Sequence, residues 1–282
     1  MVLVLFDFDG TISQSDTINA LAQSAIAHSP NPHLLQSAWG GIVQAYLADY
    51  EKHVSAYSPK ESDRTTVDAE LSFLESLRAI EEASVERVEK ARLFAGLEGG
   101  RMGDLAAWAR ETDQVMVREG FYEFVEEVVK KRGWKAEVVS VNWSGDWVGS
   151  LCRRWSGHEE LWGQRMMVNT VGCPEGMIEG PVGMGRLVTA GDKLDAASFV
   201  KRRDGEEAWV YFGDSVTDIA CLLKASVGVI MAQDRNTTLL LALDRLGFDV
   251  PHAGDCWEAQ RLIWARNFDE IVDNKILDRV KL

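Results

Sequence analysis

Four short, mostly apolar runs constrain the fold of this chain more than any other feature of its sequence. They are Val2–Phe6, Glu137–Val141, Trp209–Phe212 and Val227–Met231, and each is bounded by glycine, aspartate, asparagine or serine. Runs of this kind are typical of strands that are buried on both faces of a parallel sheet.

Helical patterns occupy the sequence between and after these runs. The spacing of apolar residues predicts helices over 121–129, 194–200, 219–223, 238–246 and 257–267. The first pattern passes through the basic segment Lys130–Arg132 to Gly133, which is typical of a helix C-terminus. Because strands and helices alternate, the sequence predicts an α/β fold on a Rossmann-like, doubly wound parallel sheet.

The segment from about Gln14 to Val117 has a different character, because it contains no convincing strand pattern. Its apolar residues recur at helical spacing, with charged residues between them and breaks at prolines and glycines. We therefore predict a core formed by residues 1–15 and 115–282. Residues 16–114 are predicted to form an all-helical domain inserted after the first strand.

Composition narrows the class of protein and its partners. The 282 residues are 46% hydrophobic and include ten tryptophans, which favours a compact globular protein over a disordered one. The formal net charge of -14 repels phosphate backbones and anionic membrane surfaces. We therefore expect neither nucleic acid nor a membrane as a partner. Bound divalent cations could neutralise part of the negative charge.

The cysteines and the first residues indicate the compartment. The four cysteines, Cys152, Cys173, Cys221 and Cys256, are far apart and make no zinc-binding pair. We interpret the four cysteines as reduced thiols of a cytoplasmic protein. The apolar run before Asp7 is too short for a signal peptide or a membrane span.

The stretch LFDFDGT at residues 5–11 ends the first predicted strand with two carboxylates, Asp7 and Asp9. Two like charges at this spacing cost free energy unless a cation lies between them or one of them is protonated. Ser140 and Asp214 also fall at the carboxyl ends of predicted strands, where ligands bind in parallel sheets. The sequence therefore predicts a site that holds a metal ion, a proton or both.

Four motifs carry a family resemblance. The chain contains Asp-x-Asp-Gly-Thr at 7–11, a strand-end serine at 140, a helix-start lysine at 193 and Gly-Asp-x-x-x-Asp at 213–218. This order resembles the haloacid dehalogenase-like superfamily of phosphatases. The inserted helices resemble the cap of its phosphoserine phosphatase-like branch, and VSVNWS and CLLKASVGVIM are similar to fungal members.

The chemistry expected of such a site begins with the aspartates. A carboxylate can attack a phosphate ester only where cations neutralise the charge, so Asp7 is the candidate nucleophile that forms an aspartyl-phosphate. Asp9 is the candidate general acid and base. Asp7 and Asp214 offer the oxygen ligands that Mg²⁺ prefers, and the resemblance adds the Asp9 backbone carbonyl as a further ligand.

Other residues are expected to hold the phosphate and the loops. The Ser140 hydroxyl and the Val141 amide would donate to phosphoryl oxygens, and Lys193 would add positive charge beside them. Thr11 would hold the first loop with a side-chain hydrogen bond. Asp218 would reach the metal through water or orient Lys193.

Each of these residues also has an ordinary structural interpretation. An isolated Asp-x-Asp-Gly is commonly a turn or a helix cap, and Ser140 alone would be a strand-end hydroxyl bonded to its neighbours. Lys193 alone would be a surface lysine, with Lys224 as a rival for its role, and Asp218 could pair locally.

Two departures from the phosphoserine phosphatase pattern bear on the substrate. Val141 and Asn142 stand where that pattern has glycines, so phosphoserine is not implied as the substrate. Asp16 stands where the pattern has a substrate-reading glutamate. It could bind a polar or cationic substrate group or cap the helix that follows it.

The sequence thus predicts a magnesium-dependent phosphatase that hydrolyses a small phosphorylated metabolite through an aspartyl-phosphate, with the helical cap closing over the substrate. One alternative is a hydrolase of non-phosphate substrates on the same fold, such as one that cleaves carbon–halogen bonds. A second alternative is a non-catalytic metabolite-binding protein. The sequence does not predict the oligomeric state.

Overall fold

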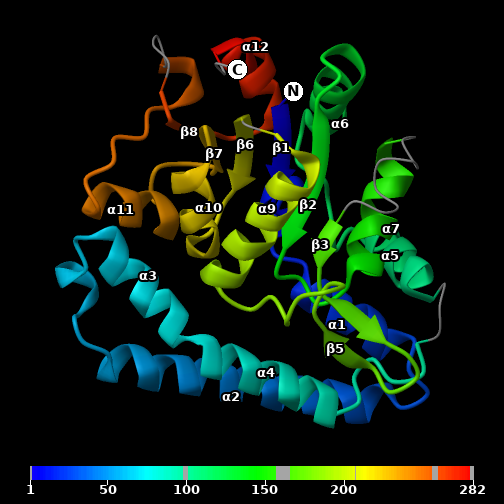
Figure 1. Ribbon diagram of the computed structural model, residues 1–282. Helices are drawn as coiled ribbons and strands as arrows, with labels where there is room; N and C mark the ends of the chain where they lie inside the picture. The colour runs from blue at the N-terminus through cyan, green and yellow to red at the C-terminus, as the bar shows by residue number, and fades with distance from the viewer. Residues whose placement is uncertain (1, 98–100, 157–165, 207, 256–259, 280–282) are drawn as a thin grey trace.

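The computed structural model describes residues 2–97, 101–156, 166–206, 208–255 and 260–279. Its centre is a six-stranded parallel sheet with the order β3-β2-β1-β6-β7-β8 (Figure 1). The strands are β1 Val2–Phe6, β2 Lys135–Ser140, β3 Met166–Val168, β6 Ala208–Gly213, β7 Val227–Met231 and β8 Leu262–Ala265. A separate antiparallel hairpin pairs β4 Thr170–Gly172 with β5 Met177–Glu179.

Helices lie between the strands and on both faces of the sheet (Figure 1). In chain order they are α1 Ile18–Ala27, α2 Pro32–Ala56, α3 Val67–Ser76, α4 Arg78–Lys90, α5 Arg101–Glu111, α6 Phe121–Val125, α7 Gly145–Ser156, α9 Ala190–Asp204, α10 Ile219–Lys224, α11 Thr238–Arg245 and α12 Phe268–Asp273. Short helical turns cover 8–12, 61–63, 126–131, 216–218, 253–255 and 276–279.

Strand β1 occupies the middle of the sheet, paired with β2 on one side and β6 on the other. Its side chains alternate between two apolar cores. Val2, Val4 and Phe6 belong to one core, and Leu3 and Leu5 belong to the other. Because every residue of β1 is buried, the strand can lie only inside a two-faced sheet. This confirms the predicted α/β class.

The predicted strands occur where the sequence placed them, with ends that shift by at most two residues. The sequence missed β3 and β8, which have three and four residues and are too short to show a period. The helix predicted over 257–267 was wrong, because Leu262–Ala265 is a strand paired with β7. The part of that prediction at 257–259 lies outside the described residues.

Helices α2, α3 and α4 form a layer across the edge at which the strands end (Figure 1). Helix α5 packs against α7, and α1 packs against α5. The exact bounds of the inserted domain, 16–114, stay a prediction. Over the described part of the chain, none of the helices is both long enough and apolar enough to cross a membrane.

Ion pairs tie the helical layer to the core. Arg78 of α4 contacts Asp192 of α9 at 2.8 Å. Arg245 of α11 contacts Glu70 of α3 at 2.6 Å, and Glu70 is buried. These contacts hold the layer directly above the carboxyl ends of the strands.

Candidate active site

The turn that follows β1 is shaped by a glycine and an arginine. Gly10 has a φ of 70°, and a Cβ at this position would come within 2.1 Å of Asp214 Oδ2, so only glycine fits. The buried Arg118 guanidinium donates to the carbonyl oxygens of Gly10 and Thr11. The turn therefore presents Asp7 and Asp9 in one defined arrangement.

Asp7 and Lys193 form a buried ion pair. Lys193 Nζ lies 3.0 Å from Asp7 Oδ2 and 2.7 Å from Asp218 Oδ1, and its side chain is fully buried. Burial lowers the pKa of Lys193, but Asp218 and Asp7 raise it more, so the amine stays charged. Lys193 thus supplies a fixed positive charge beside Asp7, whereas Lys224 is exposed at the end of α10.

Asp218 uses both carboxylate oxygens within the protein. Oδ1 also accepts from the Tyr211 hydroxyl at 2.7 Å, and Oδ2 accepts from the amides of Asp214 and Ser215 at 3.2 and 3.1 Å. These contacts make Asp218 an orienting residue for Lys193 and for the loop after β6. A direct metal bond from Asp218 would have to replace one of them.

Thr11 joins the two acidic loops. Its hydroxyl donates to Asp214 Oδ1 at 3.2 Å across 203 residues of sequence. The contact fixes the Asp214 carboxylate beside the turn that carries Asp7. The first loop is therefore held in place by a side chain, as the sequence predicted for Thr11.

The acidic cluster is arranged for a hard cation. One carboxylate oxygen from each of Asp7, Asp214 and Asp218 lies within 4.8 Å of the others. Asp7 Oδ1 is buried and has no hydrogen-bond partner among the described residues. A buried carboxylate oxygen without a partner is costly, and this donor set contains oxygen alone. The residues therefore fit Mg²⁺ or a cation of similar hardness.

The carboxylates raise one another's pKa values. Burial raises the pKa of Asp7 well above its ordinary value, Lys193 lowers it, and the neighbouring carboxylates add to the rise. Burial and the charge of Asp218 raise the pKa of Asp214 to about 7. A bound cation would reverse the effect of the neighbouring charges.

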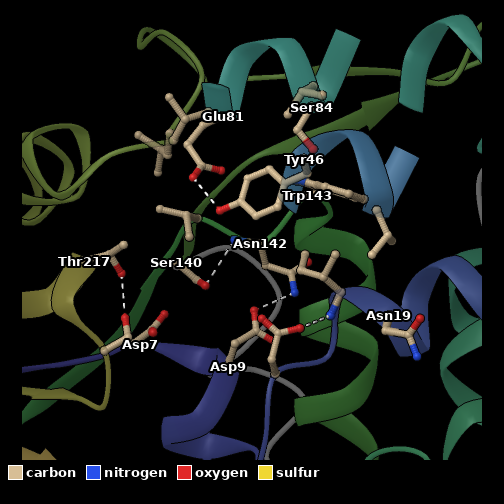
Figure 2. A pocket seen from close by; sticks show the side chains of 18 of the residues that line it. Asp7, Asp9, Asn19, Tyr46, Glu81, Ser84, Ser140, Asn142, Trp143 and Thr217 are labelled. Atoms are coloured by element: carbon tan, nitrogen blue, oxygen red, sulfur yellow. Dashed lines mark hydrogen bonds between the residues drawn. The ribbon is translucent and has the colours of Figure 1, made fainter. Parts of the chain in front are cut away.

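Asp9 lies in a separate hydrogen-bonded setting. Its Oδ1 accepts from the Thr17 amide at 2.8 Å and the Thr17 hydroxyl at 2.6 Å. Its Oδ2 accepts from Asn142 Nδ2 at 2.8 Å (Figure 2). Burial, followed by the charge of Asp16, raises the pKa of Asp9 to about 6, although these hydrogen bonds lower it. A carboxyl with this pKa can give and take a proton near neutral pH.

Ser140 and Val141 line a pocket that opens above the aspartates. Ser140 Oγ accepts from the Asn142 amide at 3.2 Å, which leaves its proton for another acceptor. Figure 2 shows Ser140 between Asp7 and Asn142. The arrangement leaves the serine able to donate toward a group bound at Asp7, and the Val141 amide contact stays a prediction.

Asp16 accepts a hydrogen bond at the start of α1 and also lines the pocket. Its Oδ1 accepts from the Ile18 amide at 2.9 Å, at the start of α1, and the residue also lines the pocket at an exposed position. The contact with Ile18 supports the interpretation as a residue that holds the helix start, and binding of a substrate group by Asp16 stays a prediction.

Sequence reasoning missed several residues that position the site. Asn142 and Thr17 hold Asp9 from segments 125 residues apart, and Trp147 Nε1 donates to the Thr17 hydroxyl at 3.3 Å. The buried Asn169 side chain holds the loop after β2 by donating to the Val141 and Asn142 carbonyls at 3.2 Å. Asn142 could have been found, since it follows the strand-end serine, but no local pattern marks Asn169.

The raised pKa values predict how stability depends on pH. The ordinary pKa of 3.8 applies to Asp9 and Asp214 in the unfolded chain, against about 6 and about 7 in the fold. The folded state holds these protons more tightly than the unfolded chain does. Their contribution to the free energy of unfolding is therefore full below the unfolded pKa and is lost as pH rises through the folded pKa.

For the metal-free protein in chelator, we expect the free energy of unfolding to fall by about 2–4 kcal/mol between about pH 5 and about pH 8. Saturating Mg²⁺ should reduce this fall, and Asp214→Asn should flatten it. Urea unfolding at several pH values measures the effect. A metal-free protein that becomes more stable over this range would contradict the prediction.

The chain is similar to one family model and to several known proteins. A family model described as haloacid dehalogenase-like hydrolase matches residues 4–223. A CTO1 family protein of Schizosaccharomyces pombe is 27% identical over 248 residues, which cover 83% of each chain. Cold tolerance protein 1 of Saccharomyces cerevisiae is 24% identical over 260 residues, which cover 81% of this chain and 78% of that protein.

Solved structures share the fold. A phosphoserine phosphatase with an analogue of its phospho-aspartyl intermediate aligns with a TM-score of 0.52 and 18% identity, covering 96% of this chain and 97% of the other. A probable phosphoserine phosphatase from Vibrio cholerae aligns with a TM-score of 0.54 and 15% identity, covering 100% of this chain and 67% of the other.

Proposed function

The chain belongs to the haloacid dehalogenase-like hydrolase family, and we propose that it is a magnesium-dependent phosphatase of a small phosphorylated metabolite. The family is the one that its four motifs predicted. One arrangement supports the proposal most: Asp7 has one oxygen paired with Lys193 and the other without a partner in the described structure. A carboxylate held in this way is ready to bind a cation and to attack phosphorus.

Mg²⁺ would be held by Asp7 Oδ1, by Asp214 and by the backbone carbonyl of Asp9. Once bound, it would neutralise the phosphate and the carboxylates that surround it. Without such a charge, the phosphate dianion would face Asp7, Asp9 and Asp214, with Lys193 already shared between two carboxylates.

In the proposed first step, an Asp7 carboxylate oxygen forms a bond to phosphorus while the bond from phosphorus to the leaving oxygen breaks. Lys193 keeps Asp7 in position, and the Ser140 hydroxyl donates to a phosphoryl oxygen. The product on the protein is an aspartyl-phosphate.

Asp9 transfers the protons in both steps. Its Oδ1 accepts two hydrogen bonds and Oδ2 accepts one, so Oδ2 has room to carry the proton. Asp9 gives this proton to the leaving alcohol oxygen. It then takes a proton from the water that hydrolyses the aspartyl-phosphate, which releases phosphate and restores Asp7.

The acid role of Asp9 makes a prediction that depends on the leaving group. We expect Asp9→Asn to lower kcat for an alkyl phosphate by about 10²–10⁴-fold. The loss in the rate of aspartyl-phosphate formation should be much smaller with 4-nitrophenyl phosphate, whose leaving group needs little protonation. Rapid-quench measurement of the 4-nitrophenol burst tests this. Equal losses in that rate for both substrates would contradict the acid role.

The proposed function is tested by phosphate release from 4-nitrophenyl phosphate with Mg²⁺ and with chelator. Beryllium fluoride should also form an adduct on Asp7, visible by fluorine NMR in the parent protein and absent from Asp7→Asn. Release that is unchanged by chelator would refute the magnesium dependence. Neither release nor an adduct would favour a non-catalytic binding protein.

A further inference from the structure

The pocket above Asp7 extends well beyond the space that a phosphate needs. It has a volume of about 590 Å³ and runs from the strand ends to helices α2 and α4. Figure 2 shows Asp7 and Asp9 at one end, with Tyr46, Glu81 and Ser84 at the other. The organic part of a bound phosphomonoester would therefore lie against the helical layer.

The walls of the pocket are aromatic and aliphatic. Trp39 of α2 meets Trp143 edge to face, with ring centroids 6.1 Å apart. Ile42, Val85 and Leu187 also line the space, and all three are buried. Such walls bind an apolar, ring-sized group, and tryptophan and tyrosine faces also attract cations.

The far end of the pocket contains an acidic group, Glu81. The Tyr46 hydroxyl donates to Glu81 Oε1 at 2.9 Å, and no basic side chain pairs with Glu81 in the part of the chain that the structure describes. Burial raises the pKa of Tyr46, and the charges of Glu81 and Asp16 raise it further. Both carboxylates therefore act on the same region of the pocket.

Basic residues are missing from the lining. Among the described residues that line the pocket there is no lysine, arginine or histidine, whereas Asp16 and Glu81 are both present. A carboxylate or second phosphate on the substrate would meet these acids with no basic side chain to neutralise it. A positively charged group would gain a favourable electrostatic interaction with them.

On the premise of the proposed phosphatase, we infer that the substrate is a phosphomonoester whose alcohol part is a flat, apolar ring system with a positive charge. Glu81 binds the charge, Asp16 adds to the negative potential, and the tryptophans enclose the ring. Although the chain shares its fold with phosphoserine phosphatases, the described lining of this pocket offers no basic partner for the carboxylate of phosphoserine.

Three synthetic phosphates test this inference. 2-(1-Methylpyridinium-4-yl)ethyl phosphate and 2-(4-methylphenyl)ethyl phosphate match in shape and differ in charge, and O-phosphoserine adds a carboxylate. We expect kcat/KM for the cationic probe to exceed that for the neutral probe by about tenfold or more, with phosphoserine the poorest.

A matched pair of variants assigns the preference to Glu81. Glu81→Gln should lower kcat/KM for the cationic probe by about 10–100-fold and leave the neutral probe almost unchanged. Glu86→Gln removes the same charge from an exposed position on the same helix and should change neither. Equal values for the two probes in the parent protein, or equal losses in Glu81→Gln, would overturn the inference.

Calorimetric binding of the two probe alcohols separates this inference from the proposed function, because it needs no catalysis. Tighter binding of the cationic alcohol, lost in Glu81→Gln, supports the inference even if no phosphate is released. In that case the proposed function alone fails. Binding without preference for the cation overturns the inference even if all three phosphates are hydrolysed.

Discussion

Replacing Asp7 by asparagine is expected to lower kcat for a phosphomonoester by at least about 10⁴-fold, because an amide cannot form the covalent intermediate. The effect should appear with every substrate, including activated aryl phosphates. Steady-state phosphate release measures it, with the variant purified free of the parent enzyme. Activity within tenfold of the parent would remove Asp7 from the mechanism.

The stability of Asp7→Asn shows whether its loss of activity comes from unfolding. Asparagine keeps the shape of Asp7 and removes one negative charge from the cluster with Asp214 and Asp218. Burial raises the pKa of Asp7, so its ionised form is costly in the metal-free fold. We therefore expect the metal-free variant to unfold at the same Tm or higher. The rise in Tm on adding Mg²⁺ should be smaller than in the parent protein.

Replacing Lys193 by methionine is expected to destabilise the protein by about 3–5 kcal/mol. The side chain is fully buried between Asp7 and Asp218, at 3.0 and 2.7 Å, and its removal leaves these carboxylates without a buried cation. Asp7 then loses the neighbouring positive charge that lowers its pKa. Urea unfolding in chelator measures the loss.

The pH dependence of this loss distinguishes charge from packing. With Lys193 gone, the pKa of Asp7 rises further, so the folded state gains stability at low pH and loses it as pH rises. The deficit of Lys193→Met should therefore be smaller at about pH 5 than at about pH 8. A packing defect alone would give the same deficit at both pH values.

Two further variants complete this test. Lys224→Met removes a charge from an exposed lysine and should change the free energy of unfolding by less than about 0.5 kcal/mol. Asp218→Asn in the Lys193→Met background should restore part of the loss, because the two residues are in direct contact. A loss in Lys224→Met as large as in Lys193→Met would contradict the assigned role.

The strands that position the site could be predicted because their signal is local. Each long apolar run is buried on both faces, and a polar residue marks its end. Since parallel strands end at one edge, the order of motifs was enough to expect Asp7, Ser140 and Asp214 together. Strand β8 was missed because four apolar residues carry too little periodicity to separate a strand from a helix.

The sequence by itself therefore determined the α/β class, the family, the aspartates and serine at the strand ends and the lysine at a helix start. Only the tertiary structure decided which side chains surround them. Asn142 contacts Asp9, which is 133 residues away in the sequence. Tyr46 of α2 contacts Glu81 of α4, which is 35 residues away. Apolar spacing shows that a helix has a buried face, but its rotation and distance from the sheet follow from packing against the other helices. Glu81, which we propose to bind the substrate, lies on one of those helices, so it could be identified only in the folded protein.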